Sequence, residues 1–82
     1  MAADKIEWVI TCYSKETEFL VKQHKLPKVD LPRVRKIFRL PEDDPVCYSY
    51  PIDEGNVDFF RPWAAIEYDF TRYEYYFESN AV

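Results

Sequence analysis

Apolar and polar residues alternate near the start of the chain, which is typical of a β-strand. Residues 14–17 are polar and turn-like, and residues 18–25 resume the extended pattern. The first of the two strands, over residues 6–13, gathers its apolar side chains on one face: Ile6, Trp8, Ile10 and Cys12. The pattern predicts a β-hairpin.

The register of this hairpin depends on which residues face each other across the turn. If Ser14 lies opposite Thr17, Ile10 pairs with Val21 and the apolar side chains of both strands share one face. We therefore expect this register.

Two helices are expected in the middle of the chain. Asp30 is a good N-cap and Pro32 sits in the first turn, where its missing N–H costs nothing. Pro41 should end this helix. One helical stripe is apolar and should face the core: Leu31, Val34, Ile37 and Phe38.

The second helix should begin at Ile52 and Asp53, with Asp53 as its cap, and end at Pro62. Its inward stripe is Val57, Phe60 and Trp63. The residues before it, 46–50, are expected to form a short extended piece.

The last segment alternates, and then its apolar parity flips. Ile66, Tyr68 and Phe70 are followed by Tyr73, Tyr75 and Phe77. A tight turn at Thr71-Arg72 explains the flip, because it pairs Phe70 with Tyr73 and puts all six side chains on one face. The opposite face then carries Glu67, Asp69, Glu74, Tyr76 and Glu78. A bulge near Thr71 is the rival explanation.

These elements predict one α+β domain over residues 1–82. We expect a small antiparallel sheet of two hairpins, in the order β-β-α-α-β-β with an optional short strand near Tyr48, and two short helices packed on one face. The chain holds 82 residues, of which 18% are aromatic, so a small core can be filled with large side chains.

The start of the chain is short and polar, and no apolar run reaches the roughly 18 residues that a membrane span needs. Two cysteines, Cys12 and Cys47, are too few for a typical disulfide-stabilised secreted domain. We expect both to be buried, reduced thiols in the cytoplasm.

The sequence offers little for catalysis. His24 is the single histidine, and alternation places it on the face of Lys22, where we expect it to be exposed. Two cysteines and one histidine at wide spacing match no structural zinc site, and one glycine excludes a glycine-rich phosphate loop. We expect no enzyme activity, no metal and no cofactor.

Charge is divided unevenly along the chain. Residues 1–40 hold nine Lys or Arg against five Asp or Glu, a net of +4, whereas residues 41–82 hold two against ten, a net of −8. Direct nucleic-acid binding through the basic stretch is disfavoured because the whole domain is acidic, with a pI near 4.9.

The acidic half indicates a surface that binds a partner, since charges of one sign speed encounter with an opposite surface. The alternative is a face that only keeps the protein soluble. We expect the binding residues to be Asp43, Asp44, Asp53, Glu54, Asp58, Glu67, Asp69, Glu74 and Tyr76.

A small, acidic, aromatic-rich chain of this kind resembles bacterial immunity proteins, which bind and neutralise a basic nuclease toxin in colicin and contact-dependent growth-inhibition systems. Three stretches also resemble a family of short bacterial proteins without a defined activity: residues 15–18, 40–45 and 50–53. The resemblance implies an immunity protein or inhibitor whose carboxylates stand in for nucleic-acid phosphates on a basic toxin.

Two other functions remain open. The chain could be a nucleic-acid mimic or regulatory adaptor that blocks a DNA-binding protein, or a structural subunit of a larger complex. Both an immunity protein and a mimic need a carboxylate-rich face, so the sequence does not separate them, and it leaves the oligomeric state open.

Overall fold

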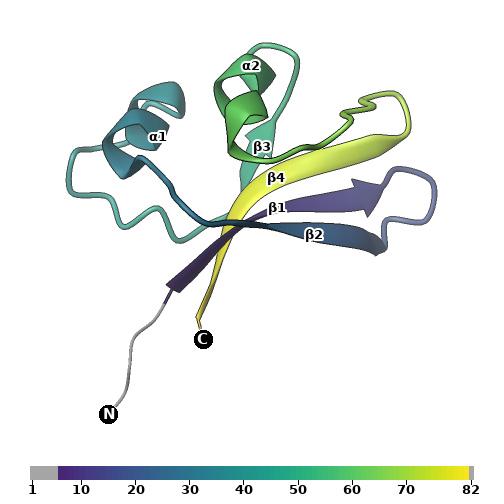
Figure 1. Cartoon of the computed structure of the whole chain (residues 1–82), viewed down its shortest axis with the longest axis horizontal. Helices are drawn as coiled ribbons and strands as arrows, with labels where there is room; N and C mark the ends of the chain where they lie inside the picture. Colours follow the sequence, from purple (N-terminus) through teal and green to yellow (C-terminus); the bar gives the residue numbers. More distant parts are fainter. Residues whose placement is uncertain (1–5, 82) are drawn as a thin grey trace.

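The computed structural model describes residues 6–81 as a four-stranded antiparallel sheet with short helices on one face (Figure 1). This confirms the α+β class. The optional extra strand is present between the two helices, but at Tyr50–Ile52 rather than near Tyr48, and Val46 takes a left-handed φ of 56° instead of an extended one. The polar start of the chain, residues 1–5, lies outside the described part. The elements in chain order are β1 Ile6–Ser14, β2 Leu20–Leu26, α1 Leu31–Ile37, β3 Tyr50–Ile52, α2 Val57–Phe60, the 3₁₀ helix η1 Arg61–Trp63, and β4 Tyr73–Ala81.

The strands lie in the order β2-β1-β4-β3, so the first and last strands of the described chain form the centre of the sheet. Both helices lie above the same face in Figure 1. The core fills the space between that face and the helices, where Ile10 and Phe77 of the sheet and Val34 and Phe60 of the helices are fully buried.

The long β1–β4 ladder fixes which side chains face the helices. Ile10 pairs with Phe77 and Cys12 with Tyr75, all four buried under the helices. The residues between them point the other way because side chains alternate across a strand. The opposite side of the sheet, which no described helix covers, therefore receives Thr11, Tyr13, Glu74, Tyr76 and Glu78. We call these five residues the uncovered face.

The first hairpin is confirmed, but the expected register is wrong. Ile10 pairs with His24 rather than Val21, a shift of three residues. The reason is a longer turn: Ser14 accepts a hydrogen bond from the Glu18 amide at 2.7 Å, and Glu18 adopts a left-handed φ of 64°. A β-bulge next to the turn completes the shift. In consequence three consecutive apolar side chains stay exposed: Phe19, Leu20 and Val21.

The same register moves His24 to the covered side of the sheet. It shares this side with Lys22, as expected, but it is half-buried rather than exposed. Burial first, and the charge of Lys22 second, lower the pKa of His24 below its ordinary value of 6.5.

We expect this shift to make the domain less stable in mild acid. The unfolded chain binds a proton at a higher pH than the folded chain does, so the free energy of unfolding falls as the pH drops through the unfolded-state pKa, and it is fully retained above that pKa. Urea unfolding at pH 7 and at about pH 5 should show this loss. The variant His24→Gln should lose less, and an equal loss in wild type and variant would contradict the assignment.

Helix α1 starts as expected and ends earlier. The Asp30 carboxylate accepts from the amide of Arg33, which confirms the cap. The helix stops at Ile37, four residues before Pro41, because Arg39 takes a left-handed φ of 57° and the Leu40 amide donates back to the Arg35 carbonyl at 2.7 Å. Ile37, the last residue of the helix, is exposed, although it was expected in the buried stripe.

Helix α2 is shorter than its sequence pattern suggested. Ile52 belongs to β3, and residues 53–56 form a turn in which Asp53 and Asn56 bond each other's amides. The helix begins at Val57, and the side chains of Val57 and Phe60 are buried as predicted. Pro62 does not end the helical run, because it lies within η1.

The expected second hairpin does not form, because its first strand is absent. Residues 66–70 pair with no strand, and the turn spans Asp69 to Tyr73, whose amide donates to the Asp69 carbonyl at 3.0 Å. The cause is that β4 already has β1 on one side and β3 on the other. The segment therefore packs against the core without joining the sheet, and the ring centres of Tyr68 and Tyr75 lie 4.7 Å apart.

The burial expected for this segment is largely confirmed. Tyr75 and Phe77 are buried, and the three apolar side chains of the extended segment pack against the core: Ile66, Tyr68 and Phe70. Glu67 and Glu74 are exposed. Asp69 is not opposite Glu74, however, since Glu74 pairs with Tyr13 of β1.

Both cysteines are free thiols, but only one is buried. Cys12 lies in the core and Cys47 is exposed, which corrects the expectation that both are buried. Burial raises the pKa of the Cys12 thiol. Within residues 6–81, no helix has the length and apolar character that crossing a membrane requires.

Candidate functional site

The nine acidic and aromatic residues expected to bind a partner do not form one surface. Glu54, Asp58, Glu67 and Asp69 line a hollow beside α2. Asp43, Asp44 and Asp53 lie in the connections before α2, and Glu74 and Tyr76 lie on the uncovered face.

Three of these carboxylates hold turns together. Asp44 accepts from the Val46 amide at 2.7 Å, and Asp53 accepts from the Gly55 amide at 2.8 Å. Asp69 accepts from the hydroxyl of Thr71 at 2.6 Å. This hydrogen bond is the main cause that lowers the pKa of Asp69. Folding therefore uses these side chains, so their charge is no sign of a partner.

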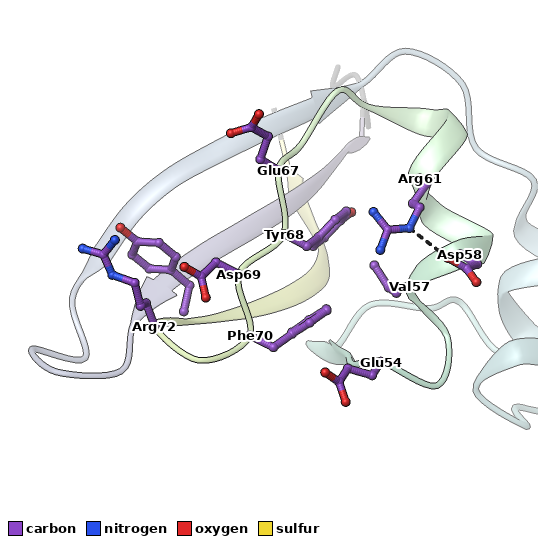
Figure 2. Close-up of a pocket in the computed structure, with 10 residues that line it drawn as sticks. Glu54, Val57, Asp58, Arg61, Glu67, Tyr68, Asp69, Phe70 and Arg72 are labelled. Carbon is purple, nitrogen blue, oxygen red and sulfur yellow. Dashed lines mark hydrogen bonds and ion pairs between the residues drawn. The ribbon is translucent and has the colours of Figure 1, made fainter.

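The hollow beside α2 has a volume of about 840 Å³ and a mixed charge (Figure 2). Arg61 and Arg72 lie among its carboxylates, and the Arg61 guanidinium lies 2.8 Å from Asp58. The same guanidinium stands 5.6 Å from the centre of the Tyr68 ring. Burial raises the pKa of Tyr68 to about 12. These two cations offset two of the four carboxylates, so the hollow presents both charges rather than a surface of one sign.

The uncovered face differs, because it joins aromatic rings to two carboxylates, Glu74 and Glu78, that form no ion pair with any residue in the range 6–81. Tyr13 of β1 and Tyr76 of β4 pack edge to face, with their ring centres 5.7 Å apart. Beside them lies a shallow hollow of about 380 Å³, whose walls are Tyr13, Lys15, Glu18, Ser49, Glu74, Tyr76 and Glu78.

Glu78 organises this face through three hydrogen bonds. Its carboxylate accepts from the hydroxyls of Thr11 at 2.7 Å, Ser49 at 2.6 Å and Tyr13 at 3.4 Å. Thr11 is fully buried beneath this network. The three donors come from β1 and from the connection before β3, so the network holds the rings and the carboxylates of the face in fixed positions.

The charges of this face favour a cationic ligand. Burial, and then the charge of Glu78, raise the pKa of Tyr13, while burial, Glu74 and Glu78 raise the pKa of Tyr76. Glu74 has no ion pair with any residue in the range 6–81. The one lysine that lines the hollow is Lys15, and its ammonium donates a hydrogen bond to the Phe70 carbonyl.

Sequence reasoning found half of this face. It placed Glu74, Tyr76 and Glu78 together but missed Tyr13 and Thr11, which β1 contributes. A signal for these two was present, since they alternate with the apolar residues of β1. The missing information was that β1 and β4 are neighbours.

Within residues 6–81, no group of three or more His, Cys, Asp or Glu side chains is placed to hold a metal ion. Residues 7–78 match a family model described as "Domain of unknown function (DUF7683)". No curated protein and no solved structure matches the chain.

Proposed function

The chain belongs to the DUF7683 family, and we propose that this member binds and inhibits a basic partner protein through its uncovered face, in the manner of an immunity protein. The observation that carries this proposal is the Tyr13–Tyr76 pair held beside Glu74 and Glu78. Tyrosine is enriched among the residues that dominate binding energy, because its ring supplies contact area with few rotatable bonds. Carboxylates around such rings select a basic partner and speed its approach.

In this proposal the partner is a bacterial toxin with nuclease activity. Glu74 and Glu78 occupy the positions that nucleic-acid phosphates would take on the surface of this toxin. The negative charge of the second half of the chain supports this partner class. The chain itself is a binder and not an enzyme. Cys12 and His24, a thiol and an imidazole that could in principle act as nucleophile and base, both lie on the covered side of the sheet, away from the uncovered face.

We place the protein in the cytoplasm, where thiols stay reduced. The exposed free thiol of Cys47 supports this compartment, because an exposed cysteine in an oxidising compartment tends to form disulfides.

A photo-crosslinking amino acid at Tyr76 tests the proposal in the native host. Illumination should join the chain to one basic protein, and the purified form of that protein should lose its toxic activity when the chain is added. The matched control carries the crosslinker at Ile37, an exposed position on α1 across the sheet from the uncovered face. Crosslinks from Ile37 but not from Tyr76 would place the binding surface on the helix-covered side of the sheet and would contradict the proposal. A captured DNA-binding regulator that is not a toxin would favour the nucleic-acid mimic instead.

A further inference from the structure

The two edges of the sheet differ in their ability to accept another strand. The β3 edge is three residues long, and Pro51 in its centre has no N–H to donate. The β2 edge is seven residues long, Leu20–Leu26, and contains no proline. Unpaired strand edges attract extended segments of other chains. Among the described strands, β2 is therefore the edge that can be extended.

The ladder shows how the backbone of β1 divides its hydrogen bonds. The amide of Lys15 donates to the carbonyl of Arg72, which continues the β1–β4 register. The amide of Ser14 donates to the carbonyl of Phe19 on the β2 side. Because the bonding direction alternates along an antiparallel strand, odd-numbered residues of β1 bond β4 and even-numbered residues bond β2.

The alternation identifies the free groups of β2. Ile10 and the other even-numbered residues of β1 lie opposite Lys22, His24 and Leu26, which therefore direct their backbone groups into the sheet. Gln23 and Lys25 direct theirs outward. Each of these two residues thus offers one N–H and one C=O along the free edge.

The side chains along this edge indicate what could pair with it. Lys22 and Lys25 are exposed and point to opposite faces. Lys22 has no ion pair within residues 6–81, whereas the Lys25 ammonium lies 3.2 Å from the carboxylate of Glu7, an exposed pair that a partner carboxylate can replace. Next to them stand three apolar side chains, exposed by 75%, 55% and 52% respectively: Phe19, Leu20 and Val21. The edge thus combines positive charge with apolar surface.

We propose that the β2 edge binds an extended acidic segment of a partner protein as a fifth, antiparallel strand. Read along the partner, acidic residues three apart would lie opposite Lys25 and then Lys22, and two apolar residues would follow against Val21 and Leu20. A second copy of this chain fits less well, because it would bring the same lysines to the same strand pair. This interaction lies outside the proposed function, since it uses another surface and the opposite charge.

The peptide acetyl-Glu-Thr-Thr-Glu-Val-Val-Thr-amide tests the proposal by titration into the labelled full chain, followed by NMR. We expect the largest amide shifts at Gln23 and Lys25 and slowed hydrogen exchange of both amides. A peptide with lysine in place of both glutamates should bind about tenfold more weakly, because two opposite-charge pairs become like-charge pairs.

Two variants separate strand addition from general attraction. Gln23→Pro removes an outward N–H and should abolish binding, whereas the matched variant Gln23→Ala should keep it. If Gln23→Pro fails to fold, the double variant Lys22→Glu and Lys25→Glu should reverse the preference toward the lysine peptide. Equal binding of both peptides by the wild type would overturn the proposal. Shifts centred on Tyr76, or a dimer of the free chain that Gln23→Pro dissolves, would overturn it as well.

Discussion

A chain that carries Glu74→Lys and Tyr76→Ala should bind its basic partner about a hundredfold more weakly than the wild type does. Removing an aromatic side chain from the centre of an interface commonly costs about 2 kcal/mol or more. Reversing a nearby charge adds repulsion to the basic surface and slows the encounter. Surface plasmon resonance should show both effects, as a faster dissociation and a slower association.

Salt provides a second measurement on the same pair of proteins. Exposed charges are screened beyond roughly 8 Å at physiological ionic strength, so the association rate of the wild type should fall steeply as salt is added. The double variant should lose most of this dependence. Its circular dichroism should match that of the wild type, because Glu74 is exposed and Tyr76 is only partly buried.

The matched control makes the same two changes outside the uncovered face, as Glu67→Lys and Tyr48→Ala. Both residues are exposed, Glu67 at the hollow beside α2 and Tyr48 in the connection before β3. Binding should change little, and an equal loss would show that the partner contacts the hollow. Reversal of the cations in α1 and just after it should also matter little: Arg33, Arg35, Lys36 and Arg39. Asp69 is unsuitable for reversal, because its carboxylate holds the turn before β4.

Replacing Phe77 with alanine should lower the free energy of unfolding by about 3–5 kcal/mol. Phe77 is fully buried, and the centre of its ring lies 5.5 Å from that of Trp8 and 5.7 Å from that of Phe60. The substitution removes a ring that joins the sheet to α2 and leaves a cavity at this contact. Since domains are stable by only about 5–15 kcal/mol, this one change should consume much of the total.

Urea unfolding of Phe77→Ala against Phe19→Ala measures the effect with a control of identical chemistry. Phe19 is 75% exposed, so its truncation should change stability by about 0.5 kcal/mol or less. A loss at Phe19 as large as that at Phe77 would mean that the exposed apolar residues 19–21 are covered in solution. The urea concentration at the midpoint of unfolding would then depend on protein concentration, because another copy of the chain would cover these residues.

Signals that act within a few residues predicted the elements of this fold well. Asp30 caps α1, and Val34, Val57 and Phe60 face the core, as their spacing indicated. Asp53 was expected to cap α2 but holds the preceding turn, and Asn56 is the N-cap. Each of these features depends on neighbours within one or two helical turns, which the sequence displays directly.

Pairing between distant strands could not be predicted in the same way. A period of two reveals the two faces of a strand but not the strand beside it. The parity flip near Thr71 therefore suggested a local hairpin, whereas β4 pairs with β1, with Tyr75 opposite Cys12. The hairpin register failed because the turn after Ser14 contains a left-handed residue, Glu18, that no glycine or asparagine marked. The uncovered face was only half found for the same reason, since its rings come from both distant strands.

The β1–β4 ladder also sets an order of events during synthesis. Ile6 lies opposite Ala81, so the central pairing of the sheet joins segments made at opposite ends of residues 6–81. The β1–β2 hairpin can form as soon as both strands leave the ribosome. The other edge of β1 then stays unpaired until Tyr73–Ala81 has been translated. A nascent chain stalled before Tyr73 would thus expose the strand that later lies at the centre of the sheet, and such chains should need a chaperone that shields it.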